Sequence, residues 1–277
     1  MTITAKDVKR LRDATDAGMM DCKKALIEAN GDFDAAIDVL RKQGLKKADK
    51  RADREAKEGL IVTAVNDDHS KGIIAEVNCE TDFVARGEVF ETFAKRIAEI
   101  AISELPDNLE GLKSLPFDNQ DTIESASVAI TGKVGEKIEV RKYQKLESSE
   151  ANGIVAYMHP GSRLGVLVKM SGNGSKADAG RDVAMQVAAL NPVATTAEEV
   201  PEEVKQKELE IAREVAVKEG KPENIVERIA EGKLKRYYKD HVLIEQPFVK
   251  DSSLTVKEML KKADVEVQTY LRFALGD

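Results

Sequence analysis

The sequence predicts an α+β fold, with a helical module at its start and antiparallel sheets covered by helices further on. Two observations lead to this prediction. Up to residue 45, apolar residues recur at helical spacing. From Gly59 onward, short apolar runs occur in pairs around polar turns, and each pair is followed by a segment of helical periodicity. Such hairpins need a helix layer to bury one face of each sheet.

Residues 1–45 are expected to form three short helices. Thr4 and Asp7 have the spacing of a capping box. Asp32 can cap the third helix, and Gly44 is expected to end it. A module this small has little core of its own. We expect it to bind other proteins, although fold class alone does not establish function.

Residues 46–58 are expected to be a charged linker. They contain almost no apolar side chain larger than alanine, so the segment is either a solvated helix or a flexible tether. Its basic residues could touch nucleic acid, but the interspersed acidic residues and the lack of aromatic residues favour a linker.

A first core subdomain is predicted at residues 59–145. Its hairpin is expected from the apolar runs 59–65 and 72–77, which flank a polar turn. A helix at 89–100 and a half-buried strand at 137–143 are expected to follow.

A second core subdomain, composed of residues 146–190 and 242–277, repeats this plan. It is predicted to contain a hairpin at 153–158 and 164–170, a helix at about 182–190 and a late strand at 267–274. Two such units indicate an internal duplication of an α+β subdomain.

Residues 191–241 interrupt the second subdomain and are expected to form an antiparallel, coiled-coil-like helical hairpin. Its outward helix is expected to bury a narrow stripe that is made of Val200, Val204, Ile211 and Val215. The hairpin is either a solvated decoration or an arm for interaction, and both interpretations are open.

Composition excludes several classes of function. The formal net charge of -7 disfavours non-specific nucleic-acid binding. No apolar run approaches the ~20 residues that cross a bilayer, and the first residues lack the apolar core of a signal peptide. Cys22 and Cys79 form no CxxC pair. We therefore expect a cytoplasmic protein that binds neither nucleic acid nor membranes.

The chain lacks the common patterns of catalytic and cofactor sites. Its histidines, which are His69, His159 and His241, have no zinc-motif spacing. Cys79 and His159 would be needed for a Cys/His hydrolase, but no supporting signature surrounds either residue. Residues 172–176 lack the spacing of a phosphate-binding loop. We therefore expect no enzymatic activity, no metal and no cofactor.

Asp82 and Phe83 follow a predicted strand and lie in an expected strand-to-helix turn. An exposed phenylalanine in a turn is normally kept for a contact with a partner. The alternative is that Phe83 folds under the next helix as a core residue, as most phenylalanines do.

Five segments of the chain, taken in order, resemble the motifs of the elongation factor Ts family. They are Val8 to Arg12 with Thr15-Asp-Ala-Gly-Met-Met-Asp-Cys-Lys-Lys-Ala-Leu26, Val77-Asn-Cys-Glu-Thr-Asp-Phe-Val-Ala85, Gly135-Glu-Lys-Ile-Glu-Val-Arg141, His159 to Val168, and Gln246-Pro-Phe-Val249. The resemblance implies a guanine-nucleotide exchange factor for elongation factor Tu, a GTPase that delivers aminoacyl-tRNA to the ribosome. It also implies a ubiquitin-associated-like N-terminal module, duplicated core subdomains and an inserted antiparallel coiled coil.

The resemblance further implies which residues contact the GTPase. Phe83 is expected to insert between its helices, and Asp82 to approach its Mg²⁺ region, with Thr81 and Val84 beside them. His159 is expected near the phosphate-binding loop of the partner. The N-terminal contacts are expected from Arg12, Met19, Met20 and Lys23. The alternative is that one of the two methionines packs in the core.

Two matters stay open from the sequence. The chain is either the exchange factor or a non-catalytic scaffold that binds partners through its helical module and coiled coil. A homodimer or a 2:2 complex with the GTPase is the second open matter, since a sheet edge, the coiled coil or cysteine-mediated pairing could each support a dimer.

Overall fold

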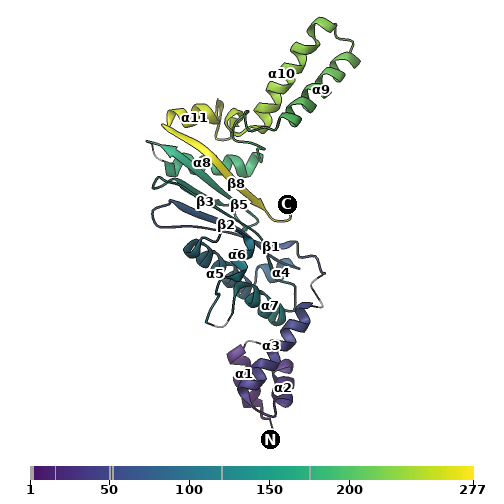
Figure 1. The fold of residues 1–277 in the computed structure, drawn as a ribbon, viewed down its shortest axis with the longest axis vertical. Coiled ribbons are helices and arrows are strands. Elements are labelled where there is room, and N and C mark those ends of the chain that lie inside the picture. Colours follow the sequence, from purple (N-terminus) through teal and green to yellow (C-terminus); the bar gives the residue numbers. More distant parts are fainter. Residues whose placement is uncertain (1–2, 16, 50, 52, 120, 175) are drawn as a thin grey trace. The chain divides into compact units, whose positions relative to one another are not determined.

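The computed structural model describes residues 3–15, 17–49, 51, 53–119, 121–174 and 176–277. It combines helices with three small sheets, so the predicted α+β class is confirmed (Figure 1). The chain forms two compact units. The first comprises Met1–Val62, Ala75–Gln144 and Ala274–Asp277, and the second comprises Thr63–Ile74 and Lys145–Phe273. The finer domain boundaries given above stay predictions.

The N-terminal part of the first unit contains the three predicted helices, α1 (Ala5–Thr15), α2 (Met19–Glu28) and α3 (Phe33–Asp49). The capping box is present, because the Thr4 N–H donates to Asp7 Oδ2 at 2.9 Å and the Asp7 N–H donates to Thr4 Oγ1 at 3.3 Å. Asp32 caps α3 by accepting from the Ala35 N–H at 2.8 Å. A small core holds the helices together, formed by Val8, Leu11, Cys22, Ala25, Leu26 and Ala36.

The prediction that Gly44 ends the third helix is wrong, since α3 continues to Asp49. Gly44 lies instead at a close contact between two helices. A Cβ built on Gly132 of α7 (Ile123–Val134) would lie 2.9 Å from the Gly44 Cα, closer than real side chains approach. The absence of a side chain on Gly132 lets the backbones of α3 and α7 approach closely. An ion pair of 2.5 Å between Arg41 and Asp121 adds to this contact. The predicted linker 46–58 therefore begins as helix.

The predicted hairpin, helix and strand follow along the chain, and the turn end of the hairpin, Thr63–Ile74, is counted with the second unit. Strands β1 (Glu58–Val65), β2 (Lys71–Cys79) and β3 (Glu139–Glu147) form a sheet in that order. Helix α4 (Asp82–Ala85) follows β2, and α5 (Glu88–Glu104), α6 (Leu109–Ser114) and α7 come before β3. Figure 1 shows α5 and α7 along one side of this sheet. Helix α5 is held there by apolar side chains, of which Phe90, Phe93 and Ile97 are buried.

The second unit contains the other predicted hairpin. Strands β4 (Ile154–Met158) and β5 (Leu164–Gly172) are antiparallel, with Ile154 opposite Lys169, and β8 (Val265–Ala274) pairs on the far side of β5. Helix α8 (Lys176–Leu190) packs on β4 and β5, and it starts six residues before the predicted position.

Four short elements of the second unit were absent from the prediction. They are a 3-10 turn, η1 (Leu243–Glu245), the strand pair β6 (Pro247–Phe248) and β7 (Asp251–Thr255), and helix α11 (Val256–Lys262). Helix α11 begins with a capping box between Thr255 and Glu258. Buried Val256 and Leu260 join this helix to the core of α8 and β5.

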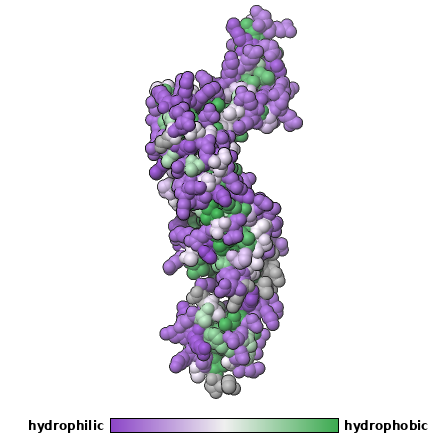
Figure 2. Space-filling view, turned by 60° about the vertical axis from the view of Figure 1, so that its left-hand side comes forward, coloured by the Kyte–Doolittle hydropathy of each residue, from purple (hydrophilic) through white to green (hydrophobic). Residues whose placement is uncertain are grey.

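The helical hairpin consists of α9 (Glu202–Lys218) and α10 (Glu223–His241), as predicted, but the expected stripe is partly wrong. Val200 is buried, whereas Ile211 and Val215 are 47% and 39% exposed. The helices instead pack through an alanine seam, which comprises Ala212, Ala216 and Ala230 together with Val226. Small residues let the two helices approach closely, so the larger ones lie beside the seam. Figure 2 shows hydrophobic residues reaching the hairpin surface at the top of the view. Among the described helices, none is both long and apolar enough for a membrane span.

Candidate functional site

The turn after β2 presents Phe83 to solvent. Strand β2 ends at Cys79, and α4 begins three residues later. Thr81 is the N-cap of α4 in an extended conformation, and its Oγ1 accepts from the Val84 N–H at 3.4 Å. Phe83 is 85% exposed, whereas Ala85 on the other side of the same short helix is buried. The alternative that Phe83 is a core residue is therefore wrong.

Asp82 carries a negative charge at the edge of this aromatic. Its Oδ2 lies 2.9 Å from an Arg86 guanidinium nitrogen, with 42% and 80% of the two side chains exposed. An exposed ion pair of this kind is worth only about 0–1 kcal/mol. The carboxylate can therefore exchange Arg86 for another partner at little cost.

Cys79 lies buried directly behind the turn. Its Sγ–H donates to the Thr81 carbonyl oxygen at 3.1 Å. Burial, followed by the nearby Glu136 carboxylate, raises the pKa of Cys79 to about 12. The thiol is therefore protonated at neutral pH, which is the opposite of what a nucleophilic cysteine needs.

Two glutamates hold the backbone around the turn. Glu136 accepts from Thr81, and Glu80 accepts from the backbone of Lys137 and from two arginines, Arg51 and Arg54. We did not single out these residues from the sequence. The only signal was that Glu80 and Glu136 both lie inside motifs of the family that the chain resembles.

His159 occupies the tight turn between β4 and β5 of the second unit. Its N–H donates to the Leu164 carbonyl at 2.9 Å, and the left-handed conformations of Gly161 and Ser162 close the turn. The imidazole is exposed, and its Nδ1 lies 3.0 Å from the Tyr157 hydroxyl, so the ring has a defined orientation.

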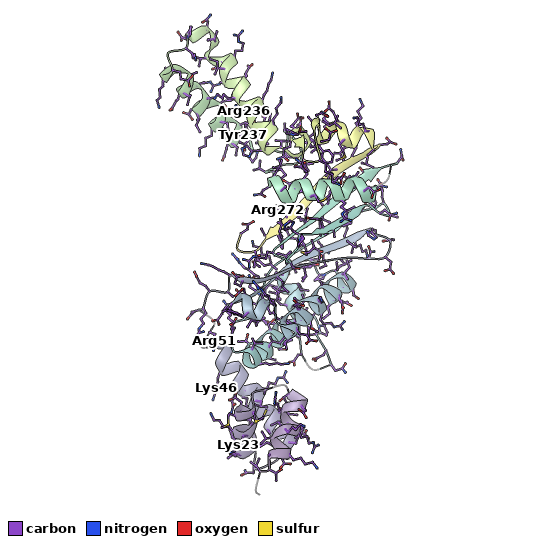
Figure 3. The ribbon with its side chains drawn as sticks, turned by 180° about the vertical axis from the view of Figure 1, so that it is seen from behind. Lys23, Lys46, Arg51, Arg236, Tyr237 and Arg272 are labelled. Atoms are coloured by element: carbon purple, nitrogen blue, oxygen red, sulfur yellow. The ribbon has the colours of Figure 1, made fainter. Side chains whose placement is uncertain are left out.

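The N-terminal module presents the four predicted contact residues to solvent. Met19 and Met20, which begin α2, are 56% and 62% exposed, so neither packs in the core. Lys23 follows one turn later, and Arg12 lies in the last turn of α1. Both are exposed, and Figure 3 marks Lys23 on this module. Adjacent exposed methionines are suited to an adaptable apolar contact.

The part of the chain that the structure describes contains no group of three or more His, Cys, Asp or Glu side chains that could hold a metal. What it offers instead is an exposed aromatic next to a carboxylate and an exposed methionine pair. These features are typical of a protein that acts by contacting a partner.

Comparison with known proteins agrees with this class. The family model described as "Elongation factor TS" matches residues 80–277. Elongation factor Ts of Chloroherpeton thalassium is 46% identical over 99% of both chains. That of Amoebophilus asiaticus is 44% identical over the full length of both. That of Thioalkalivibrio sulfidiphilus is 43% identical over 100% of this chain and 93% of its own.

The chain belongs to the elongation factor Ts family. It is therefore a translation elongation factor that works in protein biosynthesis, and it is not a catalytic enzyme.

Proposed function

We propose that this protein is a guanine-nucleotide exchange factor that binds elongation factor Tu and promotes the release of GDP. The observation that carries the proposal is the 85% exposure of Phe83 beside Asp82. A large exposed aromatic in a turn has no role within the fold, so its contact is expected with another molecule.

Exchange needs no chemistry by the exchange factor itself. A protein that prefers the nucleotide-free GTPase weakens GDP binding, and GDP weakens the binding of that protein by the same factor. GTP can then load once GDP has left. The Mg²⁺ and nucleotide involved are those held by the GTPase, so the exchange factor needs no cofactor of its own.

The residues of the turn have separate roles in this mechanism. Phe83 inserts between helices of the GTPase domain, while Asp82 disturbs the Mg²⁺ site, and Thr81 and Val84 fix the turn around them. Burial of one phenylalanine contributes roughly 1.5–3 kcal/mol. At ~1.4 kcal/mol per decade, this amounts to roughly one to two decades in an equilibrium. Other contacts must therefore share the task.

Two further surfaces are proposed to supply those contacts. His159 approaches the phosphate-binding loop of the GTPase. Arg12, Met19, Met20 and Lys23 grip the same domain from the N-terminal module, where their exposure leaves them accessible.

The finer architecture belongs to the same proposal. We infer that the N-terminal helices form a ubiquitin-associated-like module and that the core subdomains arose by duplication. The similar strand orders β1-β2-β3 and β4-β5-β8 support the duplication. The protein is expected to act in the cytoplasm, where translation occurs, without direct contacts to nucleic acid or membranes. A homodimer or a 2:2 complex is compatible with this function.

The decisive experiment measures the release of labelled GDP from elongation factor Tu with and without this protein. Acceleration at micromolar concentrations is expected, and its absence would overturn the proposal. Phe83→Ala should remove most of the acceleration. Val193→Ala is the matched control, because it removes another side chain that is more than half exposed, at 59%, outside the turn.

A non-catalytic scaffold is the second candidate. It is favoured by the exposure of Ile211, Val215 and Val217 on the helical hairpin. A scaffold would bind partners through this face and would not need Phe83. Binding that survives Phe83→Ala but fails in Ile211→Ser would favour the scaffold.

A further inference from the structure

The backbone of the Asp82-Phe83 turn is held by one glutamate from a distant loop. Glu136 accepts two hydrogen bonds from the same residue of the turn. The Thr81 N–H donates to Glu136 Oε2 at 2.9 Å, and the Thr81 hydroxyl donates to Glu136 Oε1 at 2.7 Å. Both carboxylate oxygens are thus used on a single threonine, which fixes its position and its side-chain rotamer.

A second glutamate makes the reverse connection. Glu80, which precedes Thr81, accepts from the Lys137 N–H at 2.7 Å. Each loop therefore extends a carboxylate to the backbone of the other. In each loop the glutamate directly precedes the residue whose N–H donates. Arg54 and Arg51 also reach Glu80, at 2.9 Å and 3.3 Å.

We propose that Glu136 and Glu80 form a reciprocal clasp that positions the Asp82-Phe83 turn for contact with the GTPase. We further infer that Arg51 and Arg54 couple the segment after α3 to the same clasp. Both inferences rest on the proposed function. Glu136 and Glu80 act through Phe83 as positioning residues.

The turn needs outside support because it has little of its own. Helix α4 is four residues long, and Phe83 is 85% exposed, so its side chain anchors nothing. The N-cap bond from Val84 to Thr81 Oγ1 is long, at 3.4 Å. Because the Thr81 hydroxyl donates its hydrogen bond to Glu136, a lone pair of Thr81 Oγ1 can accept from the Val84 N–H. A turn held in one geometry loses less freedom when it binds.

The environment of Glu80 keeps its carboxylate charged. Burial alone opposes ionisation, since only 17% of the side chain is exposed. The hydrogen bond from the Lys137 N–H and the ion pairs with Arg54 and Arg51 outweigh burial, and the pKa of Glu80 lies below its usual value. The acceptor is therefore ionised at neutral pH.

The arginines extend the clasp toward the N-terminal module. Arg51 lies two residues beyond the end of α3 and is marked in Figure 3. The Arg54 carbonyl also accepts from Lys137 Nζ at 3.2 Å, so this segment is held by both loops of the clasp. Arg51 and Arg54, which follow α3, are thus connected to Glu80 and to Lys137 beside Glu136.

The test combines Glu136→Ala with Phe83→Ala in a double-mutant cycle on stimulated GDP release. We expect Glu136→Ala to lower kcat/KM by about tenfold, because the turn loses its preset geometry. The loss should shrink to about twofold or less in the Phe83→Ala background, since no aromatic is left to position. Glu136→Gln retains an acceptor oxygen and should recover part of the activity. Glu110→Ala removes an ion-paired glutamate elsewhere in the first unit and is the control.

A second measurement reads the clasp without the partner. Amide hydrogen exchange at Thr81 and Val84 should rise at least about tenfold in Glu136→Ala, and exchange in β2 should stay unchanged. Equal losses of activity in both backgrounds, or unchanged exchange at Thr81, would overturn the clasp while leaving the proposed function intact. Failure of the unmodified protein to accelerate GDP release would instead overturn the function, and the role of the clasp with it.

Discussion

Gly132 of α7 lies so close to Gly44 of α3 that a Cβ on Gly132 would be 2.9 Å from the Gly44 Cα. The relationship is unequal, because a Cβ on Gly44 would lie 3.9 Å from the Gly132 Cα, which is an ordinary contact. Although both residues are helical glycines, only one of them tolerates a methyl group.

Gly132→Ala should therefore destabilise the protein by about 1–3 kcal/mol through overpacking against backbone. Gly44→Ala should be neutral or stabilise it by up to about 1 kcal/mol, because alanine favours helix. Urea unfolding of the two variants checks this difference. Equal effects would contradict the close contact between α3 and α7.

Phe83→Ala should leave the fold intact and impair the function. Because the side chain is 85% exposed, the free energy of unfolding should change by less than about 0.5 kcal/mol. Stimulated GDP release should fall by roughly one to two decades. Thermal unfolding and nucleotide release, measured on the same preparation, separate the two effects. A large loss of stability would show that the side chain supports the fold.

Glu80 should make stability depend on pH on the acid side. Its pKa in the folded protein lies below the ordinary value of 4.5, so its contacts contribute fully above that value. Their contribution should be lost as the pH falls through the folded-state pKa. Urea midpoints of the unmodified protein and Glu80→Gln should therefore differ at pH 7 and converge in acid. A constant difference across this range would contradict the expected titration.

The alanine seam of the helical hairpin predicts that a substitution within the seam lowers stability more than a substitution beside it. Ala230→Leu should cost about 1–3 kcal/mol, because Ala230 is fully buried between α9 and α10. Ile211→Ala should change stability by about 0.5 kcal/mol or less, because Ile211 is 47% exposed. Thermal unfolding of the two variants, followed by circular dichroism of the whole protein, measures the two effects. A larger loss of stability in Ile211→Ala than in Ala230→Leu would contradict the alanine seam and favour the stripe predicted from the sequence.

Local patterns in the sequence predicted much of the fold. Paired apolar runs around polar turns placed both hairpins, and helical spacing placed α5, α9 and α10. The prediction for Gly44 is wrong because a glycine that ends a helix and a glycine inside a helix look alike in sequence. The hairpin stripe was misplaced because large apolar residues were favoured over alanine, although small residues set the distance between packed helices.

The candidate site was only partly accessible from sequence. The position of Asp82 and Phe83 in a turn followed from the preceding strand, but the exposure of Phe83 required the structure. The contacts of Glu136 with Thr81 join residues 55 positions apart. No periodicity or turn signal links two such loops, so only the fold could reveal this pair.

The burial of both cysteines has a practical consequence. Cys22 and Cys79 are free thiols at 0% exposure, and burial raises the pKa of each. A maleimide fluorophore should therefore leave the folded natural chain unlabelled. Arg86→Cys would add one exposed thiol beside the turn and leave Phe83 in place, since the Arg86 side chain is 80% exposed. A dye attached there would report docking of the partner, and neither Cys22 nor Cys79 would have to be replaced first because both are buried.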